Sequence, residues 1–448
     1  MVRPTCVFAL VAAVCFIALV FYNIKIVNHS QSIFAPLSRR SGDQPPDYDD
    51  DYETTNTTRR VLDSIDDVKN CVPFYGWMEK HMKEGRGKRD QPKRSISLIG
   101  SYAFPDHIVV TTETDGRYGN TIYCRYLDKH RKEIKPAVKS VIFPEFTVYC
   151  CQRSRAEHMS ITLTEAEQIR ETVPIRDRKT DNPRFTLSMC VKPMYGMEPK
   201  FVLLAEFFEH YKLQGVQHFY VYVKDVDNYT NKLITHYVKS GEAEVVYFRK
   251  EQDRPSIEWH LVGTQDCTYR SRHDSEYTIY ADLDERILPA DNTNLISYVQ
   301  KTMPKEGNIG MIRFLQRWVL KNSTDPQVYE GNKTLLNHLP TLVFHNTSAV
   351  APIGHTAKCI TDPKKVFLMW VHWVEIYFDG YKGYEVPLSE GIIRSFRHYR
   401  DIRAGDWYRH YLPGVEKFGA FTMTDYPKHL MMPLFENVKR KLDVVYGK

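Results

Sequence analysis

The chain has 448 residues, with 61 Lys and Arg against 55 Asp and Glu, a formal net charge of +6 and 42% hydrophobic residues. This length allows one large or two medium domains with a sizeable core, in addition to an anchor and a linker. The small positive charge is spread along the chain and does not indicate nucleic-acid binding, so no nucleic-acid partner is expected.

The first feature along the chain is an apolar stretch without charged side chains, residues 6–22. It is long enough to cross most of a bilayer. A cleaved signal peptide is the alternative, although its apolar region is usually shorter and ends in small residues, whereas this one ends in Phe21 and Tyr22. We therefore expect a cytoplasmic tail (1–5), one transmembrane signal anchor (6–27) and a lumenal body.

Glycosylation triplets and cysteines downstream of the span indicate that the body faces the secretory lumen. In an oxidising lumen most cysteines should pair, and an odd number leaves at least one free thiol or an intermolecular bridge. Cys150 and Cys151 are adjacent and should have different partners. The Asn-x-Ser/Thr triplets begin at Asn28, Asn56, Asn228, Asn322, Asn332 and Asn346. The seven cysteines are Cys71, Cys124, Cys150, Cys151, Cys190, Cys267 and Cys359, and they contain no Cys-x-x-Cys pair that would indicate zinc.

Residues 28–94 are poor in apolar side chains, with an acidic, proline-containing stretch at 44–51 and a basic one at 80–94. Such segments bury too little surface to offset the entropy of ordering, so we predict a lumenal stem. Residues 86–89, Arg-Gly-Lys-Arg, resemble a proprotein-convertase site, and a solvated basic linker is the alternative.

Residues 95–184 are predicted to form a small β-rich subdomain, because runs of β-branched and aromatic residues alternate with turn signals. The predicted strands are 108–112, 121–126 and one run over 138–151.

From residue 185 to 448 the pattern alternates strand and helix, which predicts an α/β domain with a mostly parallel sheet and helices on both faces. The predicted strands are 185–191, 218–223, 243–248 and 277–281, and the predicted helices are 198–214, 228–240 and a stretch toward Arg270. Ligands bind beyond the carboxyl ends of such strands. Asp282 and Asp284 fall at this position.

Two carboxylates one residue apart at the end of a buried strand can hold Mg²⁺ or Mn²⁺ against a diphosphate, whose charge grows as a glycosyl group leaves. The alternative for Asp282 and Asp284 is a helix amino-cap or a surface turn. A second Asp-x-Asp, Asp225 and Asp227, directly precedes the Asn228 triplet and fits an amino-cap better.

Several blocks, by their order and spacing over roughly residues 185–400, resemble glycosyltransferase family 92. The blocks are 194–196, 203–216, 219–222, 265–267 and 282–285. The resemblance implies a GT-A-like fold, a UDP-sugar donor, most often UDP-galactose, and a Mn²⁺ (or Mg²⁺) requirement. It also implies inverting β-galactosyl transfer to a glycan or glycoprotein acceptor, such as fucose on N-glycans, by a Golgi type II membrane protein.

The same resemblance implies roles for individual residues. Asp282 and Asp284 would hold the metal and the diphosphate, and His372 would complete the metal site, although a histidine on an apolar strand is often a core residue. Lys192 and Tyr195, in a loop at 192–196, would cradle the uridine.

Other roles are less specific. Glu285 would orient the two aspartates, and Arg400 would face the diphosphate, with a surface salt bridge as the alternative. Arg286 stands where the family commonly has an aromatic residue, which affects the expected shape of the donor pocket.

An inverting mechanism needs a carboxylate base, for which Glu375, Glu330 and Asp325 are candidates. Trp318 is either a platform for the acceptor sugar or a residue of the sheet's core. Two other functions remain open: a transferase that uses another UDP-sugar, and a catalytically silent glycan-binding or scaffold protein with the same fold.

Overall fold

The computed structural model describes residues 63–89, 91–114, 116–249, 256–398 and 413–447. Contacts divide the chain into Met1–Thr54 and Thr55–Lys448, and every described residue belongs to the second unit. The predicted anchor and most of the predicted stem therefore lie outside the described residues. Within the described ranges, none of the helices has the length and apolar character that crossing a membrane requires.

The last part of the predicted stem is folded. Residues 63–89 contain the short helix η1 (Val68–Asn70) and the helix α3 (Tyr75–Lys83), and a disulfide joins Cys71 to Cys151. The hydroxyl of Tyr118 donates to the carbonyl of Arg86 at 2.8 Å, and the amide of Gly87 donates to Glu375 Oε1 at 3.1 Å. The composition of this segment did not predict these contacts, because they depend on partners far along the chain.

The β-rich region forms a seven-stranded, mostly antiparallel sheet in the order β4-β3-β6-β7-β1-β2-β5. Its strands are β1 (Ser97–Ala103), β2 (His107–Glu113), β3 (Thr121–Leu127), β4 (Glu133–Val141), β5 (Thr147–Cys151), β6 (His158–Thr162) and β7 (Val173–Asp177). The predicted strands at 108–112 and 121–126 are confirmed. The single predicted run over 138–151 is wrong: it is two strands, because the chain turns at Pro144, which has no amide to donate to a ladder.

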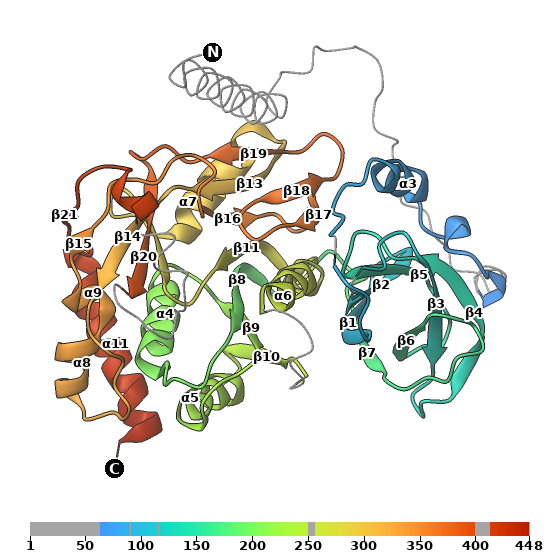
Figure 1. Cartoon of the computed structure of the whole chain (residues 1–448), viewed down its shortest axis with the longest axis horizontal. Coiled ribbons are helices and arrows are strands. Elements are labelled where there is room, and N and C mark those ends of the chain that lie inside the picture. Colours follow the sequence, from blue (N-terminus) through green and yellow to red (C-terminus); the bar gives the residue numbers. More distant parts are fainter. Residues whose placement is uncertain (1–62, 90, 115, 250–255, 399–412, 448) are drawn as a thin grey trace, which may run out of the picture. The chain divides into compact units, whose positions relative to one another are not determined.

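A second seven-stranded sheet, in the order β10-β9-β8-β11-β16-β13-β19, forms the centre of the following region (Figure 1). Strands β10, β9, β8 and β11 are parallel, whereas β16 is antiparallel to both β11 and β13, so the expected parallel sheet is half of a mixed one. Its strands are β8 (Phe185–Met194), β9 (His218–Val223), β10 (Ala243–Tyr247), β11 (Ser275–Ala281), β13 (Ile309–Phe314), β16 (Lys358–Thr361) and β19 (Lys382–Glu385).

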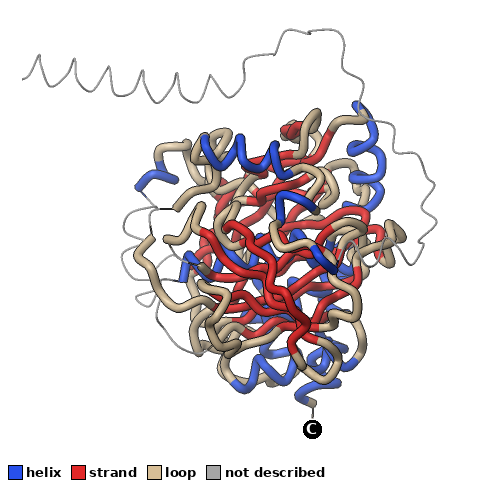
Figure 2. Tube along the Cα trace, turned by 90° about the vertical axis from the view of Figure 1, so that its right-hand side faces the viewer, coloured by secondary structure: helices blue, strands red, loops and turns tan. Residues whose placement is uncertain are grey.

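Helices cover both faces of this sheet, as predicted. Alternate side chains of a strand point to opposite faces, so Met189 packs in one apolar cluster with Phe208 of α4, and its neighbour Cys190 packs in another with Trp259 of α6. Figure 2 shows the strands running through the interior with helices outside them. The helices are α4 (Phe201–Leu213), α5 (Asn228–Lys239), α6 (Ser256–Ser271), α7 (Leu295–Thr302), η2 (Met303–Glu306), α8 (Asn332–His338), α9 (Pro340–Val343) and α11 (Lys428–Tyr446).

A five-stranded sheet, β12-β20-β14-β15-β21, and the hairpin β17-β18 complete the described structure. These strands are β12 (Glu285–Pro289), β14 (Gln316–Lys321), β15 (Asn346–Thr347), β17 (Val366–Met369), β18 (Val374–Tyr377), β20 (Gly391–His398) and β21 (Thr422–Met423). Trp318 of β14 is buried, so it belongs to the core and forms no platform for a sugar.

Three disulfides form among the described cysteines. Cys150 pairs with Cys124 and Cys151 with Cys71, which confirms that the adjacent cysteines have different partners. A third disulfide, Cys190–Cys267, joins β8 to α6, and the seventh cysteine, Cys359, is a buried free thiol.

Helix α6 also packs against β1 and β2, so it joins the β-rich region to the second sheet. The hydroxyl of Tyr102 in β1 donates to Asp266 Oδ1 at 2.7 Å, and the hydroxyls of Tyr149 and Tyr269 are 2.6 Å apart. All four residues are buried. Because buried polar groups are costly without partners, these bonds fix how the two regions meet.

Candidate active site

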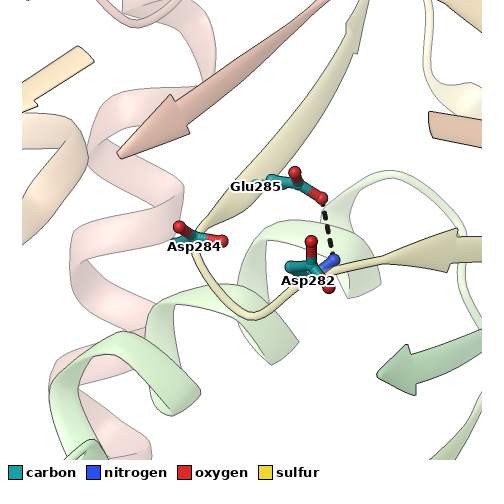
Figure 3. A group of neighbouring side chains, drawn as sticks. All are labelled: Asp282, Asp284 and Glu285. Atoms are coloured by element: carbon teal, nitrogen blue, oxygen red, sulfur yellow. Dashed lines mark hydrogen bonds between the residues drawn. The ribbon is translucent and has the colours of Figure 1, made fainter. Parts of the chain in front are cut away.

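The candidate site is the turn between β11 and β12. Strand β11 ends at Ala281, and Glu285 begins β12, so Asp282 and Asp284 lie in the connecting turn (Figure 3). The amide of Asp282 donates to Glu285 Oε2 at 2.8 Å, which folds the glutamate back over the turn. One carboxylate oxygen from each of the three acids lies within 4.8 Å of the others.

Arg286 holds this turn from inside the protein. Its Nη1 donates to the carbonyl of Leu283 at 2.8 Å, and its Nε pairs with Glu206 Oε1 of α4 at 3.1 Å, with both side chains fully buried. Burial raises the pKa of Glu206 and the charge of Arg286 opposes this effect. The guanidinium therefore points into the core toward α4. Arg286, which stands where an aromatic residue is common in the family, supports the turn from inside the protein.

Two cations from distant strands pair with the acids. Lys358 of β16 places Nζ 2.8 Å from Asp282 Oδ2 and 3.3 Å from Glu285 Oε1. Arg397 of β20 places Nη1 2.9 Å from Asp284 Oδ2 and Nη2 3.5 Å from Glu285 Oε1. Neither cation was predicted, because only the pairing of β16 with β11 and of β20 with β12 brings them here.

The carboxyl groups of Asp282 and Glu285 differ in pKa because of burial and the neighbouring cations. Burial would raise the pKa of Asp282, but Lys358 and Lys192 hold it well below its usual range. Burial raises the pKa of Glu285 to about 7, with Asp282 and Asp284 adding to the effect and Lys358 opposing it. Asp282 is therefore ionised throughout the physiological range, whereas Glu285 exchanges its proton near neutral pH.

Of the two residues predicted to bind the donor, Lys192 lies within β8 and Tyr195 directly follows it, so the predicted loop over 192–196 begins only after Met194. Lys192 is buried and donates through Nζ to the carbonyl of Val371, and burial together with the charge of Lys358 lowers its pKa to about 8. Burial and the nearby charge of Asp282 raise the pKa of Tyr195. The structure thus brings both residues near Asp282, and their contact with a uridine stays a prediction.

Two histidines lie near the acids. His372, in the turn between β17 and β18, has Nδ1 2.9 Å from the carbonyl of Ala357 and 3.2 Å from Lys358 Nζ. Burial and the charge of Lys358 lower the pKa of His372 to about 2, so the ring is neutral. Lys358 Nζ contacts both this ring and the carboxylates, and the role of His372 as a metal ligand stays a prediction.

His260 of α6 was not predicted. Its Nε2 is 3.6 Å from Asp282 Oδ1, and burial and the charge of Lys192 lower its pKa to about 3. A neutral imidazole beside the carboxylates can also act as a metal ligand. No sequence signal marked it, because its place beside Asp282 depends on the packing of α6 against β8 and β11.

The remaining predicted residues lie elsewhere. Arg400 is outside the described residues. Glu375 accepts from the Gly87 amide at 3.1 Å and pairs with Arg89 at 3.5 Å. The other two candidate bases also pair with nearby lysines: exposed Glu330 with Lys333 at 2.7 Å, and Asp325 with Lys321.

The three acids fit a hard divalent cation. Carboxylate oxygens are the ligands that Mg²⁺ and Mn²⁺ take in proteins. Asp282 and Asp284 are partly exposed, whereas Glu285 is buried behind them. The two aspartates can therefore face a bound ion and a diphosphate while Glu285 supports them.

Over residues 185–433, more than half of its length, the chain matches the model of glycosyltransferase family 92, and it belongs to that family. The chain is thus a member of a glycosyltransferase family whose enzymes use nucleotide-sugar donors, as the resemblance of its blocks predicted.

Among related proteins, the chain is similar to the beta-1,4-galactosyltransferase galt-1 of Caenorhabditis elegans. The two are 20% identical over 391 residues, which cover 82% of this chain and 87% of that protein. Glycosyltransferase family 92 protein F13G3.3 of the same organism is 23% identical over 198 residues, 41% of this chain and 37% of that one. Glucosyl-3-phosphoglycerate synthase from Mycobacterium tuberculosis has a TM-score of 0.25 at 12% identity, covering 59% and 81%, which is too weak to bear on the fold.

Proposed function

We propose that this protein is a metal-dependent transferase with a GT-A-like fold, which moves a hexose from a UDP-sugar to a hydroxyl of a glycan. UDP-galactose is the proposed donor, Mn²⁺ or Mg²⁺ the proposed cofactor and inversion the proposed outcome. The observation that carries the proposal is the acidic cluster of Asp282, Asp284 and Glu285 at the carboxyl end of β11, in a chain of family 92.

The acidic and the basic residues of the site would have different roles. Asp282 and Asp284 would hold the cation, which when bound neutralises charge on the leaving diphosphate. Lys358 is buried beside these carboxylates, whereas Arg397 is partly exposed beside Asp284 and would meet further diphosphate oxygens. A guanidinium suits this task because it can donate two parallel hydrogen bonds to a phosphate.

One observation favours a second candidate, a glycan-binding protein without transferase activity. Lys358 and Arg397 pair with all three acids, and these ion pairs would compete with a bound cation for the carboxylates. Metal-dependent binding of UDP separates the two candidates, because the silent protein would not bind UDP more tightly when Mn²⁺ is added.

We also propose that the protein is a single-pass type II protein of the Golgi membrane with a lumenal body. The apolar stretch 6–22 supports this proposal, and so do the three disulfides. The described acceptor asparagines are all exposed, as glycosylation requires: Asn228, Asn322, Asn332 and Asn346.

The test uses the full chain in a mild detergent, incubated with Mn²⁺ and a panel of UDP-sugars, with and without mixed glycans. Asp284→Asn is compared with Asp227→Asn, a matched control in the other Asp-x-Asp pair that keeps its capping group. We expect acceptor-stimulated UDP release with one donor, lost on chelation and reduced about a hundredfold to a thousandfold by Asp284→Asn alone. Release that survives chelation would refute the metal dependence, and absent release without metal-dependent UDP binding would favour the silent protein.

A further inference from the structure

A cleft of about 680 Å³ lies between the β-rich region and the end of β10, away from the acidic turn. Leu98 and Ile99 of β1 form part of one wall, and Tyr247 and Arg249 form part of the other. Its volume is in the range of pockets that bind small organic ligands. The family segment begins at residue 185, so one wall comes from outside that segment.

The two walls are held together by bonds that do not depend on a ligand. Arg249 Nη2 donates to Ser95 Oγ at 2.9 Å across the interface. The buried bond from Tyr102 to Asp266 also fixes β1, which forms part of one wall, against α6. The cleft is therefore preformed, which lowers the entropy cost of binding.

The lining of the cleft carries an excess of positive charge. Three arginines line it, together with Glu133 and Glu171. Glu133 pairs with Arg125 at 2.6 Å, so it is already neutralised. Arg131 and Arg170 are exposed and form no ion pair within the described part of the chain. Guanidinium groups bind carboxylate and sulfate groups through paired hydrogen bonds.

Tyr247 adds an aromatic surface to this charge. Its side chain is 52% exposed at the cleft, and its hydroxyl donates to Asn231 Oδ1 at 2.7 Å, which holds the ring in place. A fixed aromatic face beside hydrogen-bonding groups suits a sugar ring, which has both an apolar face and hydroxyls.

The cleft and the acidic turn lie at the same edge of the sheet. Strands β10, β9, β8 and β11 are parallel neighbours in this order, so their carboxyl ends face the same way. Three strand spacings separate β10 from β11, which is roughly 14 Å. A glycan of several sugars could therefore place one end at the turn and another part in the cleft.

We propose that this cleft binds the acceptor, and that the acceptor is an anionic glycan whose carboxylate or sulfate group meets Arg131 and Arg170. The role of the glycan as an acceptor rests on the proposed transferase function, whereas the binding of an anionic glycan does not depend on it. The region before residue 185 then selects the substrate, while the family segment binds the donor.

The test measures glycan binding directly, by titration calorimetry on the full chain in detergent at fixed salt. The probes are one neutral N-glycan and the same glycan carrying sialic acid or sulfate. We expect the anionic form to bind about tenfold more tightly, as hydrogen bonds to charged groups allow. The double variant Arg131→Gln/Arg170→Gln should bind both forms equally. Arg155→Gln, an exposed arginine of the same region outside the cleft lining, is the control and should keep the preference.

A further variant, Tyr247→Ala, and a second ligand, UDP, distinguish the possible outcomes of the test. Tyr247→Ala should weaken both glycans alike, and UDP affinity in the presence of Mn²⁺ should be unchanged in all variants. Equal affinity of the unmodified protein for the two glycans would overturn the inference, and so would a loss of UDP binding in the arginine variant, which would assign the cleft to the donor. If transfer is never observed but the arginine-dependent preference is, the cleft is confirmed and only the transferase proposal fails.

Discussion

Replacing Lys358 by Met removes a buried positive charge that pairs with Asp282 and Glu285. Lys358 is 1% exposed and Glu285 fully buried, with Nζ 3.3 Å from Glu285 Oε1 and 2.8 Å from Asp282 Oδ2. Removing one partner of a buried ion pair costs about 3–5 kcal/mol. Because neither Lys358 nor Glu285 is screened by water, we expect Lys358→Met to lower the free energy of unfolding by about this amount at neutral pH.

The loss should depend on pH. In the folded protein the pKa of Glu285 is about 7, against an ordinary value of 4.5, so its ionisation costs stability as pH rises through this window. Lys358 opposes that rise in pKa, so without it the pKa of Glu285 moves higher still. The deficit of Lys358→Met should therefore be smaller at pH 5.5, where Glu285 is protonated, and larger at pH 8.5.

The assay is unfolding by urea in EDTA at both pH values, for the unmodified protein, Lys358→Met and the double variant Lys358→Met/Glu285→Gln. The amide of Gln carries no charge, so the double variant should recover part of the stability at pH 8.5 and little at pH 5.5. A deficit that is equal at the two pH values, or a double variant no more stable than the single one, would refute this account.

Arg286→Met should cost about 3–5 kcal/mol in the free energy of unfolding, because it leaves Glu206 buried and unpaired; a loss below 1 kcal/mol would contradict the pairing. Removing the Cys71–Cys151 disulfide by double replacement with Ser should cost about 4–5 kcal/mol, from the entropy of an 80-residue loop in the unfolded chain, as measured in urea. Asp227→Ala should cost about 1 kcal/mol, because its side chain caps α5 by accepting from a backbone amide, and should leave UDP affinity unchanged in calorimetry.

Local sequence patterns predicted the parallel half of the sheet well. The strand predicted over 218–223 is β9 at the same residues, and α5 begins at the predicted Asn228 with Asp227 as its cap. Alternating apolar side chains predict the strand, and Gly215 and Gly241 mark the ends of the helices. These signals lie within a few residues of the elements that they predict. The helix predicted from 198 starts later, at Phe201, because Pro199 precedes it.

The sequence predicted only those residues of the acidic cluster that lie close together along the chain. Asp282 and Asp284 follow their strand directly, so position along the chain was enough to select them. Lys358 and Arg397 come from strands more than 70 residues later, and each looks like an ordinary surface cation in its own strand. Their burial beside the acids depends on pairings between distant strands, which no local periodicity encodes.

Cleavage after Arg89 would not by itself separate the body from the upstream chain. Cys71 lies before residues 86–89 and Cys151 after them, and the disulfide joins the two fragments. After such a cut, the fragments would migrate as one species on a non-reducing gel and as two after reduction. A secreted form of this protein would thus need a cut upstream of Cys71 or a reductant as well as a protease, so nicking and shedding are separate events.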